Sequence, residues 1–111
     1  MILLLSSLGL SNNPVYEIEY HYDNTNIKSI TYYNIRNNKI ELARIELYWI
    51  NGQKYSETYH VSGLKYKEML WYENGQKGME CKEVDIRGVN CKYWRRDGNT
   101  AKEEELSDSE E

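Results

Sequence analysis

Apolar and polar residues alternate with a period of two over several stretches of the chain, as they do in β-strands that bury one face. In residues 16–22, tyrosine and isoleucine occupy one face, while glutamate and histidine occupy the other. Residues 55–61 and 64–72 repeat this alternation, with Glu57 and Glu68 as interruptions. The pattern predicts an all-β chain built from short strands.

Residues 40–49 break the alternation, because the apolar positions slip by one between Leu42 and Ile45. A β-bulge near residues 43–44 explains the slip, since a bulge inserts one extra residue into a strand. A short helix with Leu42, Ile45 and Trp49 on one side also fits the spacing. We expect the bulged strand, because this stretch leads directly into a predicted turn.

A motif recurs every 23 residues, as the spacing of Gly52, Gly75 and Gly98 shows. Each copy has an aromatic residue four positions before the glycine, an Asn or Asp directly before it and a glutamate five positions after it. The three glutamates are Glu57, Glu80 and Glu103. Because they recur in register, we expect a structural role for them, either accepting hydrogen bonds from turn amides or pairing with a neighbouring Lys or Arg. Repeats of this length indicate stacked supersecondary units.

A degenerate fourth copy precedes these three, with Thr25 at the position of the glycine. It lies 27 residues before Gly52, so we expect a four-residue insertion between Asn34 and Ile45.

The dipeptides at the centre of each copy predict β-hairpins, because Asn-Gly and Asp-Gly favour two-residue type I′ turns with positive φ at both positions. The predicted turn residues are Asn51, Gly52, Asn74, Gly75, Asp97 and Gly98. Looser return turns are expected at Ser62-Gly63 and Arg87-Gly88. Stacked side by side, such hairpins form an elongated antiparallel meander of about eight strands.

The motif resembles the variant MORN repeat (membrane occupation and recognition nexus). Residues 71–77, Trp-Tyr-Glu-Asn-Gly-Gln-Lys, are close to the consensus of that family, residues 48–54 share its Asn-Gly-Gln core, and residues 94–100 match in part. The resemblance covers roughly residues 20–103. It implies an elongated array of hairpins that serves as an interaction scaffold, and similar repeats occur in antitoxin components of bacteria, in large DNA viruses and in eukaryotes.

Composition and charge divide the chain of 111 residues into three parts. Residues 1–14 form an apolar arm, which we expect to be a strand or a docking segment because it lacks the basic start of a signal peptide. Residues 15–104 form the array, with turns near 24–25, 51–52, 74–75 and 97–98. Residues 105–111 are an acidic tail, which we expect to be disordered.

The formal charge of −4 arises from the C-terminus, because residues 102–111 hold six acids and one lysine. The rest of the chain is nearly neutral and offers no electrostatic footprint for nucleic acid. The same balance disfavours binding to an anionic membrane surface.

Cys81 and Cys91 lie five residues on either side of Ile86, so a turn at Ile86-Arg87 places them opposite each other across a hairpin. A disulfide is then geometrically plausible. Because secretory features are lacking, we expect a cytoplasmic protein with free thiols. His21 and His60 have no partners at metal-ligand spacing, so no metal, cofactor or catalytic residue is expected.

The recurring aromatics occupy two neighbouring columns, with Tyr48, Trp71 and Trp94 in one and Trp49 and Tyr72 in the next. On a strand these columns face opposite sides of the sheet. We expect one column to build the ladder between hairpins and the other to be available to a partner, unless both are covered by the N-terminal arm or another chain. Trp49, Trp71, Tyr72 and Trp94 are the candidate interaction residues.

The sequence therefore predicts a non-enzymatic scaffold that binds another protein or a second copy of itself. An antitoxin-like neutraliser of a partner toxin is the first alternative. A weak peripheral membrane protein that binds phospholipid is the second.

Overall fold

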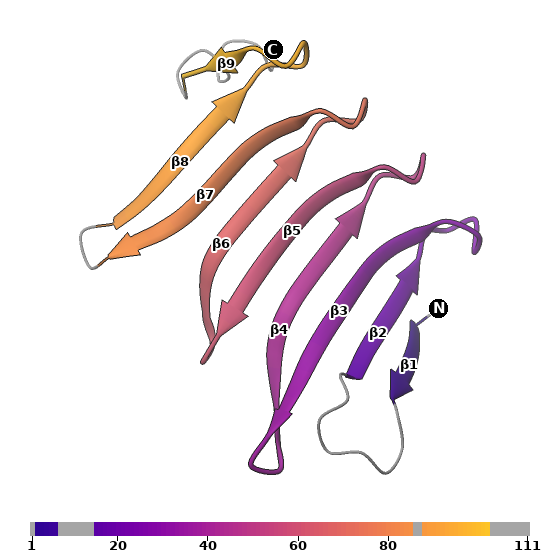
Figure 1. Cartoon of the computed structure of the whole chain (residues 1–111). Helices are drawn as coiled ribbons and strands as arrows, with labels where there is room; N and C mark the ends of the chain where they lie inside the picture. The colour runs from indigo at the N-terminus through magenta and orange to yellow at the C-terminus, as the bar shows by residue number, and fades with distance from the viewer. Residues whose placement is uncertain (1, 7–14, 86–87, 103–111) are drawn as a thin grey trace.

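The protein is an all-β meander in which every strand pairs antiparallel with the next one along the chain (Figure 1). The computed structural model describes residues 2–6, 15–85 and 88–102, and these form one sheet of nine strands in the order of the sequence. The all-β class and the meander of hairpins are thus confirmed. No helix long and apolar enough to cross a membrane occurs in the part of the chain that is described.

The strands are β1 (Ile2–Ser6), β2 (Val15–Tyr20), β3 (Ile27–Arg36), β4 (Lys39–Tyr48), β5 (Lys54–Val61), β6 (Leu64–Trp71), β7 (Lys77–Asp85), β8 (Gly88–Trp94) and β9 (Thr100–Ala101). Residues 2–6 of the apolar arm therefore form the first strand, paired with β2. The predicted acidic tail, Glu103 and the turn at Ile86-Arg87 lie outside the described residues.

The sheet is a single layer, with principal extents of 49 × 42 × 18 Å. Within the described ranges, no element covers either face (Figure 1). Among residues 15–83 and 88–102, for which burial is described, the only buried hydrophobic residues are Val15 and Met69. Because the fold has no core between layers, its stability depends on cross-strand neighbours within the sheet.

The phase slip in residues 40–49 is a β-bulge in β4, as the sequence predicts. Tyr32 pairs with Arg44 while Tyr33 pairs with Leu42, so Ala43 is the extra residue. The bulge restores the alternation, because Leu42 and Ile45 thereby face the same side of the sheet.

Turns lie at the predicted Asn-Gly and Asp-Gly motifs, but the predicted type I′ conformation is wrong. The Gly52 amide donates to the carbonyl of Trp49, and the Trp49 amide donates to the carbonyl of Gln53, so the loop has three residues. Gly52 has a φ of 91°, whereas Asn51 is not among the residues with positive φ. This is a type I turn followed by a left-handed glycine, and residues 72–76 and 95–99 repeat it.

The two-residue turns lie at the opposite end of the sheet. Asn37 and Asn38 both have positive φ between the pair Arg36 and Lys39, and Ser62 and Gly63 do so between Val61 and Leu64. The tight and the looser turns are thus exchanged relative to the prediction. The predicted insertion before the copy that contains Gly52 lengthens the β3–β4 hairpin.

In the first loop Asn24, not Thr25, takes the place of the glycine. The Asn24 amide donates to the carbonyl of His21, as that of Gly52 does to Trp49, and Asn24 has a φ of 59°. Asn is among the few residues that tolerate this conformation. The loop is one residue longer than the others, because the His21 amide donates to the carbonyl of Asn26.

Candidate interaction surface

Side chains from the first three loops hydrogen-bond the main chain of the next hairpin. The donors occupy one repeat position and differ in chemistry: the imidazole of His21, the indole of Trp49 and the phenol of Tyr72. His21 Nε2 lies 2.9 Å from the carbonyl oxygen of Tyr48, Trp49 Nε1 donates to Trp71 at 3.3 Å and Tyr72 Oη donates to Trp94 at 2.7 Å. Each acceptor is the last residue of a strand, so these contacts fix the spacing of successive hairpins.

The turn asparagines add a second link between loops. Asn51 accepts from the Gln53 amide within its own loop and donates to the carbonyl of Glu73 in the next. Asn74 repeats both contacts one hairpin further on. Asp97 keeps only the first contact, accepting from the Asn99 amide. A carboxylate has no donor to offer, which suits the last loop of the described array.

Aromatic rings and lysines alternate along the row of the sheet next to these loops. Tyr48 pairs with Lys54 and Trp71 pairs with Lys77 across neighbouring strands. The ammonium groups of Lys54 and Lys77 lie 5.6 and 5.7 Å from the Trp71 ring centroid, and Lys77 lies 6.0 Å from that of Trp94. At these distances a cation is attracted to the ring face.

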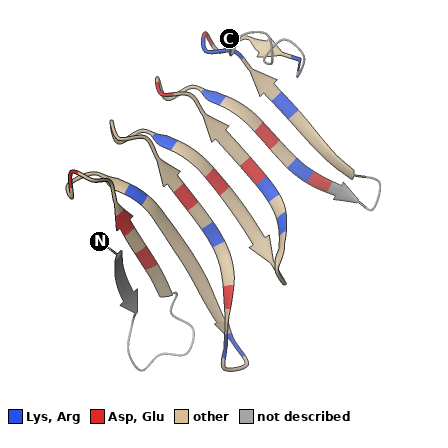
Figure 2. Cartoon of the chain, turned by 180° about the vertical axis from the view of Figure 1, so that it is seen from behind, with Lys and Arg blue, Asp and Glu red and all other residues tan. Residues whose placement is uncertain are grey.

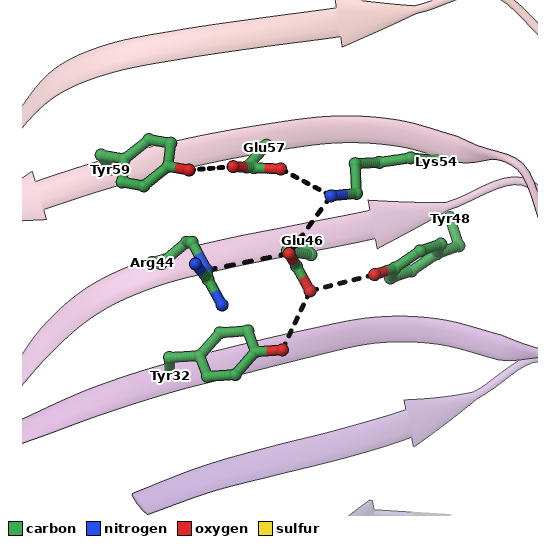
Figure 3. Close-up of polar contacts among 7 residues, drawn as sticks. All are labelled: Tyr32, Arg44, Glu46, Tyr48, Lys54, Glu57 and Tyr59. Carbon is green, nitrogen blue, oxygen red and sulfur yellow. Dashed lines mark hydrogen bonds and ion pairs between the residues drawn. The ribbon is translucent and has the colours of Figure 1, made fainter. Parts of the chain in front are cut away.

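A polar network centred on Glu46 lies beside this row, on the same face of the sheet (Figure 3). Glu46 is only 7% exposed, and its carboxylate accepts hydrogen bonds from the hydroxyls of Tyr32 and Tyr48 and from Lys54. The guanidinium of Arg44 is stacked 4.1 Å from the Tyr32 ring centroid, with its Nε 3.7 Å from Glu46. Burial and the bond to Glu46 raise the pKa of Tyr48 to about 12.

Glu57 extends the network to the next strand, as it pairs directly with Glu46. Lys54 lies between the two carboxylates, 2.6 Å from Glu57 and 3.3 Å from Glu46, and the Tyr59 hydroxyl also donates to Glu57 (Figure 3). Burial alone would raise the pKa of Glu57, but the bonds from Lys54 and Tyr59 outweigh it and hold that pKa below its ordinary value. Lys77 and Glu80 repeat the pair at 2.9 Å.

The recurring glutamates Glu57 and Glu80 therefore pair with lysines, as expected from their register. Both carboxylates of the network have their oxygens bonded to cations or hydroxyls. Acidic and basic residues are interspersed over the strands (Figure 2). This face is thus held by its own ion pairs.

The opposite face carries a largely apolar row that runs from β4 to β8. Register pairs connect Leu47 to Ser56, Ser56 to Leu70, Leu70 to Met79 and Met79 to Tyr93 without a break. These residues are half-buried except for Ser56, which is buried, and no described element covers them. We call Leu47, Ser56, Leu70, Met79 and Tyr93 the apolar row.

Cys81 and Cys91 face each other on β7 and β8, and the structure joins them in a disulfide. The expectation of free thiols is therefore wrong for this structure, although the predicted placement across a hairpin is right. That expectation rested on the absence of secretory features, whereas the register places the two Cα atoms 4.0 Å apart.

The four candidate interaction residues, Trp49, Trp71, Tyr72 and Trp94, are all half-buried, and each contacts other residues of the chain. Sequence reasoning missed Glu46 and Arg44, which lie outside the recurring columns. The equivalent of Glu46 in the next repeat is Met69, so a search for recurrence passes over it.

Comparisons of the chain with protein-family models, with curated proteins and with solved structures find no match.

Proposed function

We propose that this chain is a MORN-like repeat array that acts as a scaffold for protein–protein interaction, without catalytic activity. The observation that carries the proposal is the apolar row on an uncovered face. In a layered protein such a row packs against a helix or a second sheet. Here the described chain provides no such layer, and a partner protein supplies the missing cover.

The polar face also supports a role in binding and not in catalysis. Its carboxylates are bonded to Lys54 and to tyrosine hydroxyls, so the groups that would act in acid–base chemistry are engaged within the sheet. Lowering the pKa of Glu57 favours its ionised form, which is the opposite of what a general acid needs. The network instead links β3, β4 and β5 through side-chain bonds, and a surface held in one conformation loses little entropy on binding.

The proposal is tested by affinity capture from extracts of the source cells with matched variants on the two faces of β7. Met79→Gln places an amide in the apolar row at similar volume, whereas Lys82→Gln changes an exposed residue on the opposite face. We expect the wild type and Lys82→Gln to retain one protein in stoichiometric amount and Met79→Gln to lose it.

Equal capture by all three chains, or no stoichiometric partner for the wild type, would contradict the proposal. Circular dichroism of each variant separates lost binding from lost folding.

A further inference from the structure

Among the described strands, only the two residues of β9 lie against the outer edge of β8. β9 covers only the C-terminal end of β8, where Ala101 pairs with Tyr93 and Thr100 pairs with Trp94. Along Gly88–Lys92 no other described strand lies against that edge. An open edge presents unpaired main-chain donors and acceptors, which invite another strand.

Two observations identify the main-chain groups that point outward. The Cα atoms of Cys81 and Cys91 are 4.0 Å apart, which is the spacing of a non-hydrogen-bonded pair. The N–H and C=O of Cys91 therefore point away from β7. At the loop end, the Arg95 amide donates to Asn99 on the side of β9, and alternation along the strand gives Cys91 and Val89 that same direction.

The edge has few of the features that block strand addition. Pro14 is the only proline of the chain, so β8 contains none. Lys92 is its one charged residue, and it pairs with Glu80 on the polar face. Val89 is 69% exposed and lies on the same face as Cys91. The open segment thus combines outward main-chain groups with an exposed apolar side chain.

We propose that β8 pairs antiparallel with β8 of a second copy of this chain, about a two-fold axis at Asn90. Cys91 then lies opposite Val89 of the second copy, and each such pair exchanges two main-chain hydrogen bonds. Two symmetric pairs give four hydrogen bonds. The inference deepens the proposed function, on which it rests, by naming one partner.

Residues 88–92 are complementary to the same residues of a second copy in this register. Lys92 lies opposite Gly88, so no like charges oppose each other, and Val89 packs beside Cys91 on the face of the apolar row. A register centred on Cys91 would place Val89 opposite Tyr93, which β9 already holds. The near-neutral charge of residues outside 102–111 removes long-range repulsion between the arrays.

The test is sedimentation of the purified full-length chain from micromolar to millimolar concentration. We expect the mass to rise with concentration from 13.2 kDa to twice that value. Val89→Pro removes an N–H that points away from β7, so it leaves the hairpin paired and blocks the edge. We expect Val89→Pro to stay monomeric, and Val89→Thr, which keeps the N–H, to dimerise. Circular dichroism checks that both variants fold.

A cross-link reports the register. Asn90→Cys should give a covalent dimer on oxidation, because position 90 faces itself across the axis, whereas Lys92→Cys should not. The proposal is overturned if the wild type is monomeric throughout, or if Val89→Pro dimerises as the wild type does. It is also overturned if dimers form only after residues 103–111 are removed, because the chain would then cover its own edge. None of these results bears on capture through the apolar row, so the two proposals fail separately.

Discussion

The ring of Tyr72 lies directly over the main chain of Gly78. A Cβ built on Gly78 would meet Cε2 of Tyr72 at 2.9 Å, which is closer than real Cβ contacts. Gly78 is buried although it lies within strand β7, where glycine is usually unfavourable. The phenol that donates to Trp94 reaches its acceptor across this glycine. The absence of a side chain at Gly78 therefore lets the Tyr72 ring lie against β7.

Gly78→Ala should lower the free energy of unfolding by about 1–3 kcal/mol, because the new methyl group must displace the Tyr72 ring. Urea denaturation measures the loss. In a Tyr72→Ala background the same substitution should cost much less, because the ring is gone. An equal cost in both backgrounds would show that the ring does not determine the effect.

Asn74→Asp should lower the free energy of unfolding by about 0.5–1.5 kcal/mol. The substitution keeps the acceptor for the Gln76 amide but loses the donor to the carbonyl of Arg96. Asp97→Asn is the matched control at the same position of the last loop, where a donor has no described loop to reach, and it should leave stability within about 0.5 kcal/mol. The link between loops is refuted if Asn74→Asp is as neutral as its control.

Glu46→Gln should destabilise the protein by about 1.5–3 kcal/mol. The buried carboxylate of Glu46 accepts hydrogen bonds from Lys54 and from two tyrosine hydroxyls, and the substitution removes its charge. The control is Glu19→Gln, because the carboxylate of Glu19 is exposed and lies 3.6 Å from Lys28. Exposed pairs contribute about 0–1 kcal/mol. Thermal unfolding of both variants checks the difference, and equal losses would contradict a central role for Glu46.

Alkaline pH should destabilise the fold through Tyr48. Its pKa is raised to about 12 in the folded chain from the ordinary value of 10.0. The unfolded chain therefore loses this proton first, and the stabilising effect, complete below pH 10, is lost as the pH rises towards 12. Between about pH 9 and about pH 11, Tyr48→Phe should lose less unfolding free energy than the wild type. Identical losses would show that Tyr48 titrates normally.

The strands, the bulge at Ala43 and the repeated hairpins could be predicted, because each leaves a periodic signal in the sequence. The turn type could not, since Asn-Gly fits both a type I′ turn and a type I turn followed by glycine. All three loops share a contact within the loop, in which the turn Asn or Asp accepts from the amide two residues further on, as Asn51 does from Gln53. The dipeptide alone does not define how many residues the loop contains.

The candidate surface was harder to predict than the fold. Trp49 and Tyr72 stand out in the sequence as large aromatics that recur, yet they hydrogen-bond the neighbouring hairpin. Leu47 and Met79 do not share a repeat position and become one row only through the register of four strands. Bulges and loop lengths set that register, and these are the features a single sequence defines least.

The most direct test of the central claim, that equivalent hairpins lie side by side in one sheet, is the set of Hα–Hα contacts seen by NMR. The alternation of pairs that places Cys81 and Cys91 4.0 Å apart makes three others close. They are Glu46–Glu57 within one hairpin, Met69–Glu80 within the next and Ser56–Leu70 between the two. Strong cross-peaks are expected for all three. Peaks within the hairpins but none for Ser56–Leu70, or peaks shifted by one residue, would contradict a continuous sheet of stacked repeats.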